Sequence, residues 1–474
     1  MKTLGRKEEI ERLQKIAESK QAEFVAVYGR RRIGKTFLIR EFFKNEFTFY
    51  ATGLANANTQ KQLTSFTIFV NQSFEKDYGT FNNWLEAFNV LIKELKKRKG
   101  KKIIFLDELP WFDTKKSDFI SGLEFFWNSW ASANADVKLI VCGSAASWII
   151  NKLIKNKGGL HNRLTARIKL EPFTLHETEL FLQSKGIALD RYQIVQLYMV
   201  MGGIPYYLNH VQKGLSAAQN IQQLCFEKNG LLKSEFTFIW SSLFTNASKH
   251  ETIIRKIVEL GGSAKREEIM SSANLSTGGD VSTKLKELEE SGFVTGYTSY
   301  GTTSSKKTYC VSDFYSMFYL KFIAPGNKKS FNTWLNKIDD PSVKAWEGIT
   351  FEQVCLQHMP QIKNALKISG VSSEETTWQV KGNGKTKGTQ IDLIIDRRDR
   401  IVNLCEVKFS IAPFTITKSY DGDLRNKLNT FKETTKTRKA IFLTMITTYG
   451  LVQNEYSRSI VQNEITMDDL FISV

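Results

Sequence analysis

The sequence has few of the residues that build disulfide and zinc sites. Its 474 residues include 5 cysteines and 5 histidines, scattered along the chain, and neighbouring cysteines are at least 45 positions apart. This spacing excludes a disulfide framework and a CxxC zinc site. Any metal chemistry is therefore expected to use oxygen ligands, which suit Mg²⁺ or Mn²⁺.

Long apolar runs are also missing. No stretch reaches the roughly 18 apolar residues of a membrane-spanning helix. The first segment, MKTLGRKEEIERL, alternates charges where a signal peptide would need an apolar core. We therefore expect a cytoplasmic protein with no membrane partner. Proline and glycine number only 7 and 30, which excludes collagenous and low-complexity classes.

Basic residues, in contrast, are in clear excess. The chain has 66 Lys and Arg against 49 Asp and Glu, a net charge of +17, and a pI of about 9.4. Such a surplus indicates a polyanionic partner such as nucleic acid, or else a diffuse solubilising charge. The length itself suggests about three domains of about 150 residues each.

A phosphate-binding loop is predicted near the N-terminus. The apolar segment 24–28 runs into GRRRIGKT and then into a helical pattern, which is the setting that the GxxxxGK[ST] motif requires. Lys35 is expected to reach the β- and γ-phosphates of ATP and Thr36 to ligate Mg²⁺. We expect at least two of the three loop arginines to face solvent. The predicted ATP-binding residues are Gly29, Arg30, Arg31, Arg32, Ile33, Gly34, Lys35 and Thr36.

Two acids follow the apolar run of KKIIFLDEL. Adjacent carboxylates are costly inside a strand, so they are expected at its C-terminal tip, where parallel sheets bind ligands. Asp107 is predicted to hold Mg²⁺ and Glu108 to orient the attacking water, unless one of them caps the next helix. Ser144 ends a third strand and is a candidate γ-phosphate contact or helix cap. Arg163 is a candidate arginine finger, acting in cis or across a homo-oligomer interface, or a surface ion pair.

The middle of the chain changes pattern. Helices are predicted over 176–232, and three short helices with a hairpin over 250–312, which is the layout of a winged helix-turn-helix. Its third helix carries Lys284 and Lys286 beside three glutamates. This acidic balance disfavours phosphate contacts, so both direct DNA binding and a packing role stay open.

A second acidic group is predicted near the C-terminus. Two apolar strands, at 391–396 and 401–408, form a hairpin in which Glu406 and Lys408 share a face and Asp392 lies nearby. The two acids are candidate Mg²⁺ ligands for phosphodiester cleavage, Lys408 would stabilise developing charge, and Glu352 is a fourth candidate. Residues 385–440 contain 13 Lys and Arg against 7 Asp and Glu. An ordinary ion-pair cluster is the alternative.

These motifs together resemble the archaeal-type ATPase family, on the AAA+ side of the P-loop NTPases and close to the STAND signalling ATPases. The similar segments are LGRKEEIERL, GRRRIGKT, LDEL, CGSAAS and GGIPYYL. The C-terminal part resembles PD-(D/E)XK nuclease-like domains. The resemblance implies a winged helix, an ATPase site at Lys35, Asp107, Glu108, Ser144 and Arg163, and a nuclease site at Glu352, Asp392, Glu406 and Lys408. Two departures are Asn162, where relatives often have Gly before the finger, and the absence of a proline before Asp392.

The predicted fold is α/β, with four segments. An AAA+-like P-loop NTPase sheet with a helical lid spans 1–235, a winged helix-turn-helix 236–323, a linker 324–342, and a restriction-endonuclease-like domain 343–474. The predicted function is an ATP-hydrolysing, DNA-associated protein with a Mg²⁺-dependent nuclease-like domain. The alternatives are a STAND-like signalling or defence switch, and a winged-helix regulator whose C-terminal domain is non-catalytic.

Overall fold

The computed structural model describes residues 4–244, 247–273, 279–301, 307–325, 334–380 and 388–474. The predicted linker 324–342 therefore falls partly outside the described residues. The chain divides into two compact units. Unit 1 comprises Met1–Pro172, Phe238–Ala247 and Glu290–Gly292, and unit 2 comprises Phe173–Thr237, Ser248–Glu289 and Phe293–Val474.

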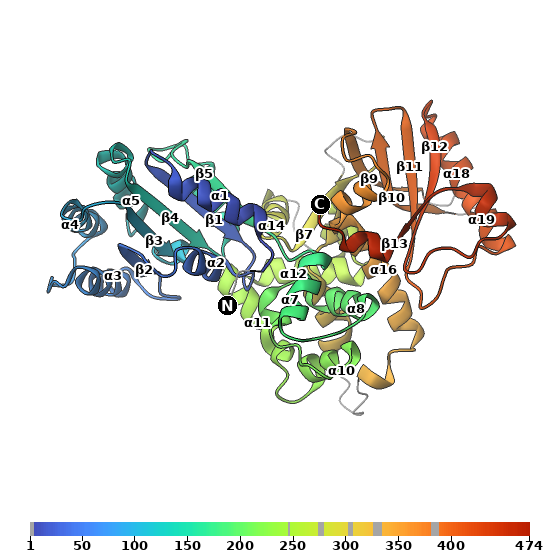
Figure 1. Ribbon diagram of the computed structural model, residues 1–474, viewed down its shortest axis with the longest axis horizontal. Helices are drawn as coiled ribbons and strands as arrows, with labels where there is room; N and C mark the ends of the chain where they lie inside the picture. The colour runs from blue at the N-terminus through green and yellow to red at the C-terminus, as the bar shows by residue number, and fades with distance from the viewer. Residues whose placement is uncertain (1–3, 245–246, 274–278, 302–306, 326–333, 381–387) are drawn as a thin grey trace. The chain divides into compact units, whose positions relative to one another are not determined.

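Unit 1 is built on a five-stranded parallel sheet (Figure 1). The strand order is β2-β3-β4-β1-β5, and every neighbouring pair is parallel. This confirms the predicted α/β class with a parallel P-loop sheet. The strands are β1 (Glu23–Gly29), β2 (Phe49–Thr52), β3 (Lys102–Asp107), β4 (Val137–Gly143) and β5 (Ala166–Leu170).

Helices cover both faces of this sheet, because its strands are apolar on both sides. One face packs against α3, α4 and α5 through a core that includes Phe66, Trp84 and Phe126. The other packs against α1 and α2 through Leu13 and Leu38. The helices are α1 (Lys7–Glu18), α2 (Lys35–Phe42), α3 (Thr59–Phe74), α4 (Trp84–Lys96), α5 (Phe119–Ser129) and α6 (Ala146–Ile149).

Unit 2 begins with a group of helices. The chain turns sharply at Gly203, whose φ is 64° and where an added Cβ would lie 2.2 Å from the Phe173 carbonyl oxygen. Buried His358 ties this group to the later helices by accepting a hydrogen bond from the Leu175 N–H at 3.0 Å. The helices are α7 (Leu175–Ser184), α8 (Arg191–Met201), α9 (Pro205–Leu208) and α10 (Ala217–Ile221). The next helix, α11 (Leu231–Leu243), begins in unit 2 and belongs to unit 1 from Phe238 on.

Three helices and a small antiparallel sheet of order β6-β8-β7 come next. The buried side of the helices is apolar and includes Ile253, Ile269 and Leu285. The elements are α12 (Ser248–Glu259), β6 (Ser263–Lys265), α13 (Arg266–Ser272), α14 (Gly279–Glu290), β7 (Val294–Thr298) and β8 (Lys307–Val311), followed by α15 (Phe314–Phe318) and the π-helix η5 (Tyr319–Ile323).

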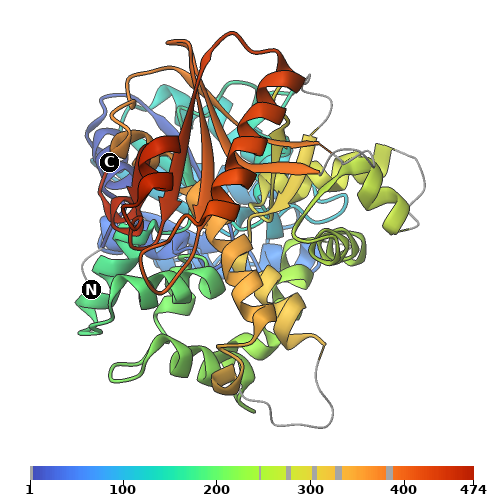
Figure 2. The same ribbon diagram turned by 90° about the vertical axis from the view of Figure 1, so that its right-hand side faces the viewer.

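The C-terminal part is a mixed five-stranded sheet, seen face-on in Figure 2, with the order β13-β12-β11-β10-β9. The β9, β10 and β11 strands pair antiparallel, whereas β11, β12 and β13 pair parallel. The helices α16 and α18 pack on this sheet. The elements are α16 (Pro341–Gln357), α17 (Met359–Ala365), β9 (Ser373–Val380), β10 (Thr389–Arg397), β11 (Ile401–Lys408), α18 (Lys418–Thr435), β12 (Ala440–Thr447), α19 (Glu455–Ile460) and β13 (Val461–Thr466).

The division into units differs from the predicted domain boundaries near 235 and 343, which stay predictions. Residues Phe173–Thr237, predicted to be a lid of the first domain, group with unit 2. Of the helices that the structure describes, none is both long and apolar enough to cross a bilayer.

Candidate functional site

The segment 29–36 forms a loop between β1 and α2. β1 ends at Gly29 and α2 begins at Lys35, as the motif requires. Gly29 has φ 146°, and an added Cβ would lie 2.3 Å from the Leu170 carbonyl oxygen, so only glycine fits there. Gly34 has φ 93° and occupies the N-cap of α2. The loop therefore leads directly into a helix N-terminus, where backbone N–H groups favour an anion.

Lys35 is buried inside this loop. Its Nζ donates hydrogen bonds to the carbonyl oxygens of Gly29 and Arg30, at 3.1 and 2.9 Å. Burial lowers the pKa of the ammonium group, and the neighbouring Glu108 carboxylate opposes that shift. The loop itself thus solvates the lysine through two neutral carbonyl groups.

Thr36 and Asp107 lie together at the ends of the loop and of β3. The Thr36 Oγ1 donates to the Asp107 Oδ1 at 3.1 Å, and the Cys142 thiol donates to the same oxygen at 2.6 Å. Burial raises the pKa of Asp107. Two adjacent oxygen ligands beside a phosphate loop fit Mg²⁺, which binds through one or two protein oxygens together with substrate phosphates. Sequence reasoning missed Cys142, because only the β3-β4 pairing brings it to Asp107.

Glu108 and Ser144 also meet, at the tips of the neighbouring strands β3 and β4. The Glu108 Oε1 accepts from the Ser144 hydroxyl at 2.7 Å, and its Oε2 accepts from the Ser144 N–H at 3.1 Å. Glu108 has φ 46°, a left-handed conformation that is uncommon for this residue type. Ser144 therefore holds the carboxylate in a fixed position at the sheet edge.

The arginines differ from expectation in one respect. Arg30 is buried, and Arg31 and Arg32 are half-buried, so the prediction that at least two of the three face solvent is wrong. The loop packs into the protein and covers their side chains. Arg163 is exposed, and it makes no ion pair with any residue that the structure describes. Its role as a finger stays a prediction.

The four predicted nuclease residues come together on unit 2. Glu406 and Lys408 lie on β11, Asp392 on β10 and Glu352 on α16. The β9-β10 pairing is irregular between Ile391 and Ile394, which is where Asp392 lies, and such irregularities re-aim side chains. The Asp392 Oδ2 accepts a hydrogen bond from the Val407 N–H at 3.2 Å. The sheet thus brings residues 15 positions apart into direct contact.

Glu406 is buried and surrounded by donors. Its Oε1 accepts from the Lys408 Nζ at 3.0 Å and from the Tyr420 hydroxyl at 2.8 Å, and its Oε2 pairs with the Lys427 Nζ at 2.7 Å. Burial alone would raise the pKa of Glu406, but the two lysines hold it below its ordinary value. Sequence reasoning missed Tyr420 and Lys427. Their seven-residue spacing places both on one side of α18, a signal that is visible only once that helix is known to cover β11.

The other two acids carry charge less easily. Burial, followed by the Asp392 charge, raises the pKa of Glu352 to about 8. Burial, followed by the Glu406 charge, raises the pKa of Asp392 to about 6. Three carboxyl groups therefore share a buried site with two lysines, and a further cation would relieve their repulsion.

The fit of Mg²⁺ to this site is limited to two ligands. Among the described residues, no group of three or more His, Cys, Asp or Glu side chains is arranged to hold a metal ion. Mg²⁺ commonly binds through one or two carboxylates and keeps several waters. Asp392 and Glu406 therefore fit as a two-carboxylate set, in which Glu406 would exchange one of its present donors for the metal.

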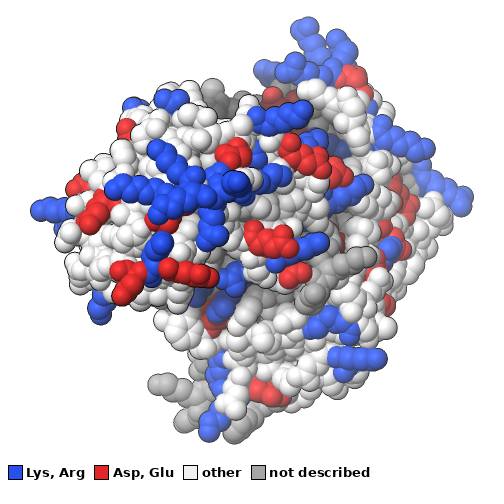
Figure 3. Space-filling view, turned by 60° about the vertical axis from the view of Figure 1, so that its left-hand side comes forward, with Lys and Arg blue, Asp and Glu red and all other residues white. Residues whose placement is uncertain are grey.

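One exposed basic segment is relevant to the predicted polyanionic partner. The segment 93–102 carries seven Lys and Arg, and six of them are exposed: Lys93, Lys96, Lys97, Arg98, Lys99 and Lys101. Figure 3 shows Lys and Arg side chains gathered in a band on one face of the molecule. On α14, by contrast, Lys284 pairs with Glu287 at 2.9 Å, so this helix offers less free positive charge.

Comparison with known proteins gives a family match to the N-terminal part of the chain and a relative that aligns with most of the chain. Residues 4–211 match the family model of an ATPase domain predominantly from Archaea. An uncharacterized protein of Methanocaldococcus jannaschii is 26% identical over 431 residues, which cover 90% of this chain and 91% of that protein. An uncharacterized ATP-binding protein of the same organism is 44% identical over 43 residues, covering 9% of this chain and 73% of that protein.

Two solved structures give partial matches. A Walker-type ATPase of Pyrococcus abyssi is 15% identical, with 67% of this chain and 96% of that chain covered and a TM-score of 0.48. The ORC2 protein of Aeropyrum pernix in ADPNP-ADP complexes is 13% identical, with 68% and 92% covered and a TM-score of 0.44.

Proposed function

We propose that residues 4–211, which match the family model of an ATPase domain predominantly from Archaea, bind and hydrolyse ATP. We further propose that this ATPase acts on DNA and carries a second, Mg²⁺-dependent site that cleaves phosphodiester bonds. The observation that carries the proposal is the group of Glu352, Asp392, Glu406 and Lys408, in which Glu406 is buried and the other three are half-buried. Removing several charged groups from water at one place is costly unless they are paired or bind a cation.

In the ATP site, each residue has a proposed part. The 29–36 loop cradles the phosphates with its N–H groups, and Lys35 exchanges its two carbonyl partners for the β- and γ-phosphates. Thr36 and Asp107 hold Mg²⁺, which neutralises phosphate charge when bound. Glu108 orients the attacking water, and Ser144 keeps its carboxylate in place. Arg163 supplies charge to the transition state, from the same chain or from a second copy.

In the C-terminal site, Asp392 and Glu406 would hold Mg²⁺, and the bound ion would supply Lewis-acid chemistry to the scissile phosphate and to a water. Lys408 lies 3.0 Å from Glu406 and stabilises the charge that develops on the phosphate. Lys427 fixes the other oxygen of Glu406. Glu352 keeps its proton at neutral pH, since its pKa is about 8.

The remaining segments support a DNA partner. The helices and small sheet within 236–323 are proposed to be a winged helix that packs more than it reads sequence, because Lys284 is already paired. The exposed basic residues at 93–101 and the surplus over 385–440 are the proposed phosphate contacts.

The test is cleavage of supercoiled plasmid with Mg²⁺ or Mn²⁺ by the full chain and by Asp392→Ala. We expect the wild-type protein to nick or linearise the plasmid and the variant to lose at least about 10²-fold in rate. Asp399→Ala is the matched control, since Asp399 is exposed in the same hairpin and pairs with Arg397. Equal cleavage by the wild type and Asp392→Ala, or none by either, would contradict the proposal.

A further inference from the structure

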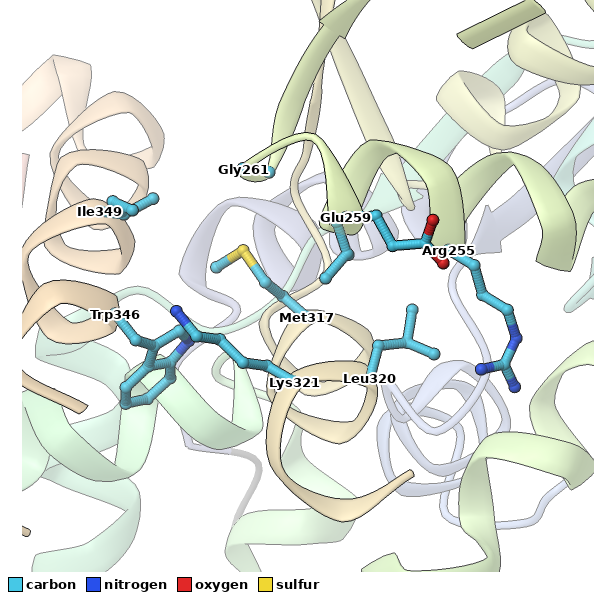
Figure 4. A pocket seen from close by; sticks show the side chains of 10 residues that line it. Arg255, Glu259, Gly261, Met317, Leu320, Lys321, Trp346 and Ile349 are labelled. Atoms are coloured by element: carbon cyan, nitrogen blue, oxygen red, sulfur yellow. The ribbon is translucent and has the colours of Figure 1, made fainter. Parts of the chain in front are cut away.

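A surface cavity of about 390 Å³ lies within unit 2, apart from the acidic site (Figure 4). It is bounded by α12, by α16, and by α15 with the π-helix η5. Figure 4 shows side chains from these elements around a common space. A volume of this size is within the range of small-molecule sites, which are mostly apolar with a few polar groups.

The cavity has an apolar floor and a mixed mouth. Met317 and Trp346 are buried, each with 3% of its side chain exposed, and Leu320 is half-buried beside them. At the mouth, Ile349 and Lys321 are exposed. The floor therefore favours an apolar body, and the mouth can accept a polar group in water.

The charges at the mouth are not equivalent. Arg255 donates to the Glu251 carboxylate at 2.6 and 2.9 Å, and the Glu259 carboxylate pairs with Lys256 at 2.7 Å. Lys321 pairs with no carboxylate among the residues that the structure describes; its ammonium lies 5.7 Å from the Phe322 ring. Lys321 is thus the cation at this mouth that is left for a ligand.

Trp346 supplies an independent sign of a missing partner. Its indole Nε1 is buried, and it has no hydrogen-bond partner among the described residues. A buried donor without an acceptor destabilises the fold, and a buried Trp N–H ordinarily finds a partner. The ring itself is held by Phe318, Phe322 and Trp334, at 5.3, 5.4 and 6.3 Å between centroids, so it cannot turn freely to find one.

We propose that this cavity binds a small amphipathic organic anion. Its apolar body lies over Met317 and Leu320, and its acidic group accepts a hydrogen bond from the Trp346 indole and pairs with Lys321. The inference does not depend on the proposed nuclease function, because no residue of the acidic site lines this cavity.

The experiment is a fluorescence titration of the full chain with 8-anilinonaphthalene-1-sulfonate, in the presence of saturating ATP to fill the nucleotide site. We expect one saturable site per chain. Lys321→Met keeps the apolar stem, so it should fold normally, yet it should weaken binding about tenfold. Lys321→Arg should restore binding to within about twofold. The uncharged analogue N-phenyl-1-naphthylamine should bind more weakly and should not distinguish Lys321→Met from the wild type.

Two further variants locate the site. Leu320→Trp fills the cavity and should abolish binding, and Trp346→Phe removes the N–H with little change of shape and should weaken binding about tenfold. Lys432→Met, on the exposed side of α18, should bind as the wild type does. The proposal fails if the wild type shows no saturable site, or if Lys321→Met and Leu320→Trp bind the sulfonate as well as Lys432→Met does.

Discussion

The two acidic sites of this protein balance their charges in opposite ways. In unit 1, the Asp107 carboxylate accepts from a hydroxyl and a thiol, and Glu108 accepts from a serine. These donors are neutral. In unit 2, the Glu406 carboxylate is bound by two lysines and a tyrosine. The acids of the first site are thus hydrogen-bonded by neutral groups and lie near one cation, Lys35, whereas Glu406 is bound directly by two lysines.

The two sites therefore also differ in the partners that their lysines bind. In unit 1, Lys35 is buried but turned onto its own loop, ready to exchange carbonyls for phosphates. In unit 2, Lys408 and Lys427 already neutralise Glu406. Burial and the neighbouring carboxylates raise the pKa values of Glu352 and Asp392. In the proposed nuclease site, the lysines belong to the protein, so the substrate needs to supply no cation with its phosphodiester groups.

The largest expected effect comes from Lys35→Ala. ATP turnover should fall at least about 10²–10³-fold, because the charge that contacts the β- and γ-phosphates is removed. The fold should persist, since burying a lysine is costly and its pKa is already lowered. Phosphate release measures the effect, with exposed Lys61→Ala on α3 as the control.

Lys35→Ala also tests whether the C-terminal site works independently of the nucleotide site. Plasmid cleavage by Lys35→Ala should continue without ATP at the wild-type rate, because the second site holds its own lysines. Loss of cleavage in Lys35→Ala, with turnover intact in Lys61→Ala, would show that the C-terminal site depends on the nucleotide site.

A smaller effect is expected on stability as a function of pH. The folded-state pKa of Glu352 is raised to about 8, so its stabilising contribution is complete below the unfolded value of about 4.5 and is lost as pH rises towards 8. Glu352→Gln mimics the protonated acid and should therefore lose less stability between pH 5 and pH 8. The difference in slope should be at most about 1.4 kcal/mol per pH unit.

Urea unfolding at several pH values, with Mg²⁺ removed by chelation, measures that slope. Glu374→Gln is the matched control, because Glu374 is exposed on β9. If wild-type and Glu352→Gln proteins have parallel stability curves over this range, Glu352 is not held protonated by its neighbours, and the contrast between the two sites weakens.

The sequence was informative where chemistry is confined to one continuous segment. The motif at residues 29–36 predicted the strand before it, the turn and the helix after it, because the phosphate contacts come from consecutive backbone groups. The placement of Asp107 and Glu108 at a strand tip followed from the cost of burying adjacent carboxylates. The alternation of a hairpin predicted that Asp392 lies near Glu406, and the Glu406 charge contributes to the raised pKa of Asp392.

Residues that depend on tertiary packing could not be predicted. Cys142 reaches Asp107 only because β4 lies next to β3. Tyr420 and Lys427 reach Glu406 only because α18 covers β11. The burial of Arg30 depends on how its loop packs, and hydrophobic periodicity in the sequence does not predict this packing. The grouping of helices α7 to α10 with unit 2 likewise depends on contacts with elements far along the chain.

We propose that Asp392 and Glu406 form a metal site of their own. Counting the Mn²⁺ ions that nucleotide-free protein binds at pH 8.5 is the direct test of this proposal. Free Mn²⁺ is followed by electron paramagnetic resonance during a titration of wild type, Asp392→Ala and Asp399→Ala. We expect the wild type and Asp399→Ala each to bind one Mn²⁺ per chain at this site, and Asp392→Ala to lose that ion. Equal Mn²⁺ binding by wild type and Asp392→Ala would contradict it.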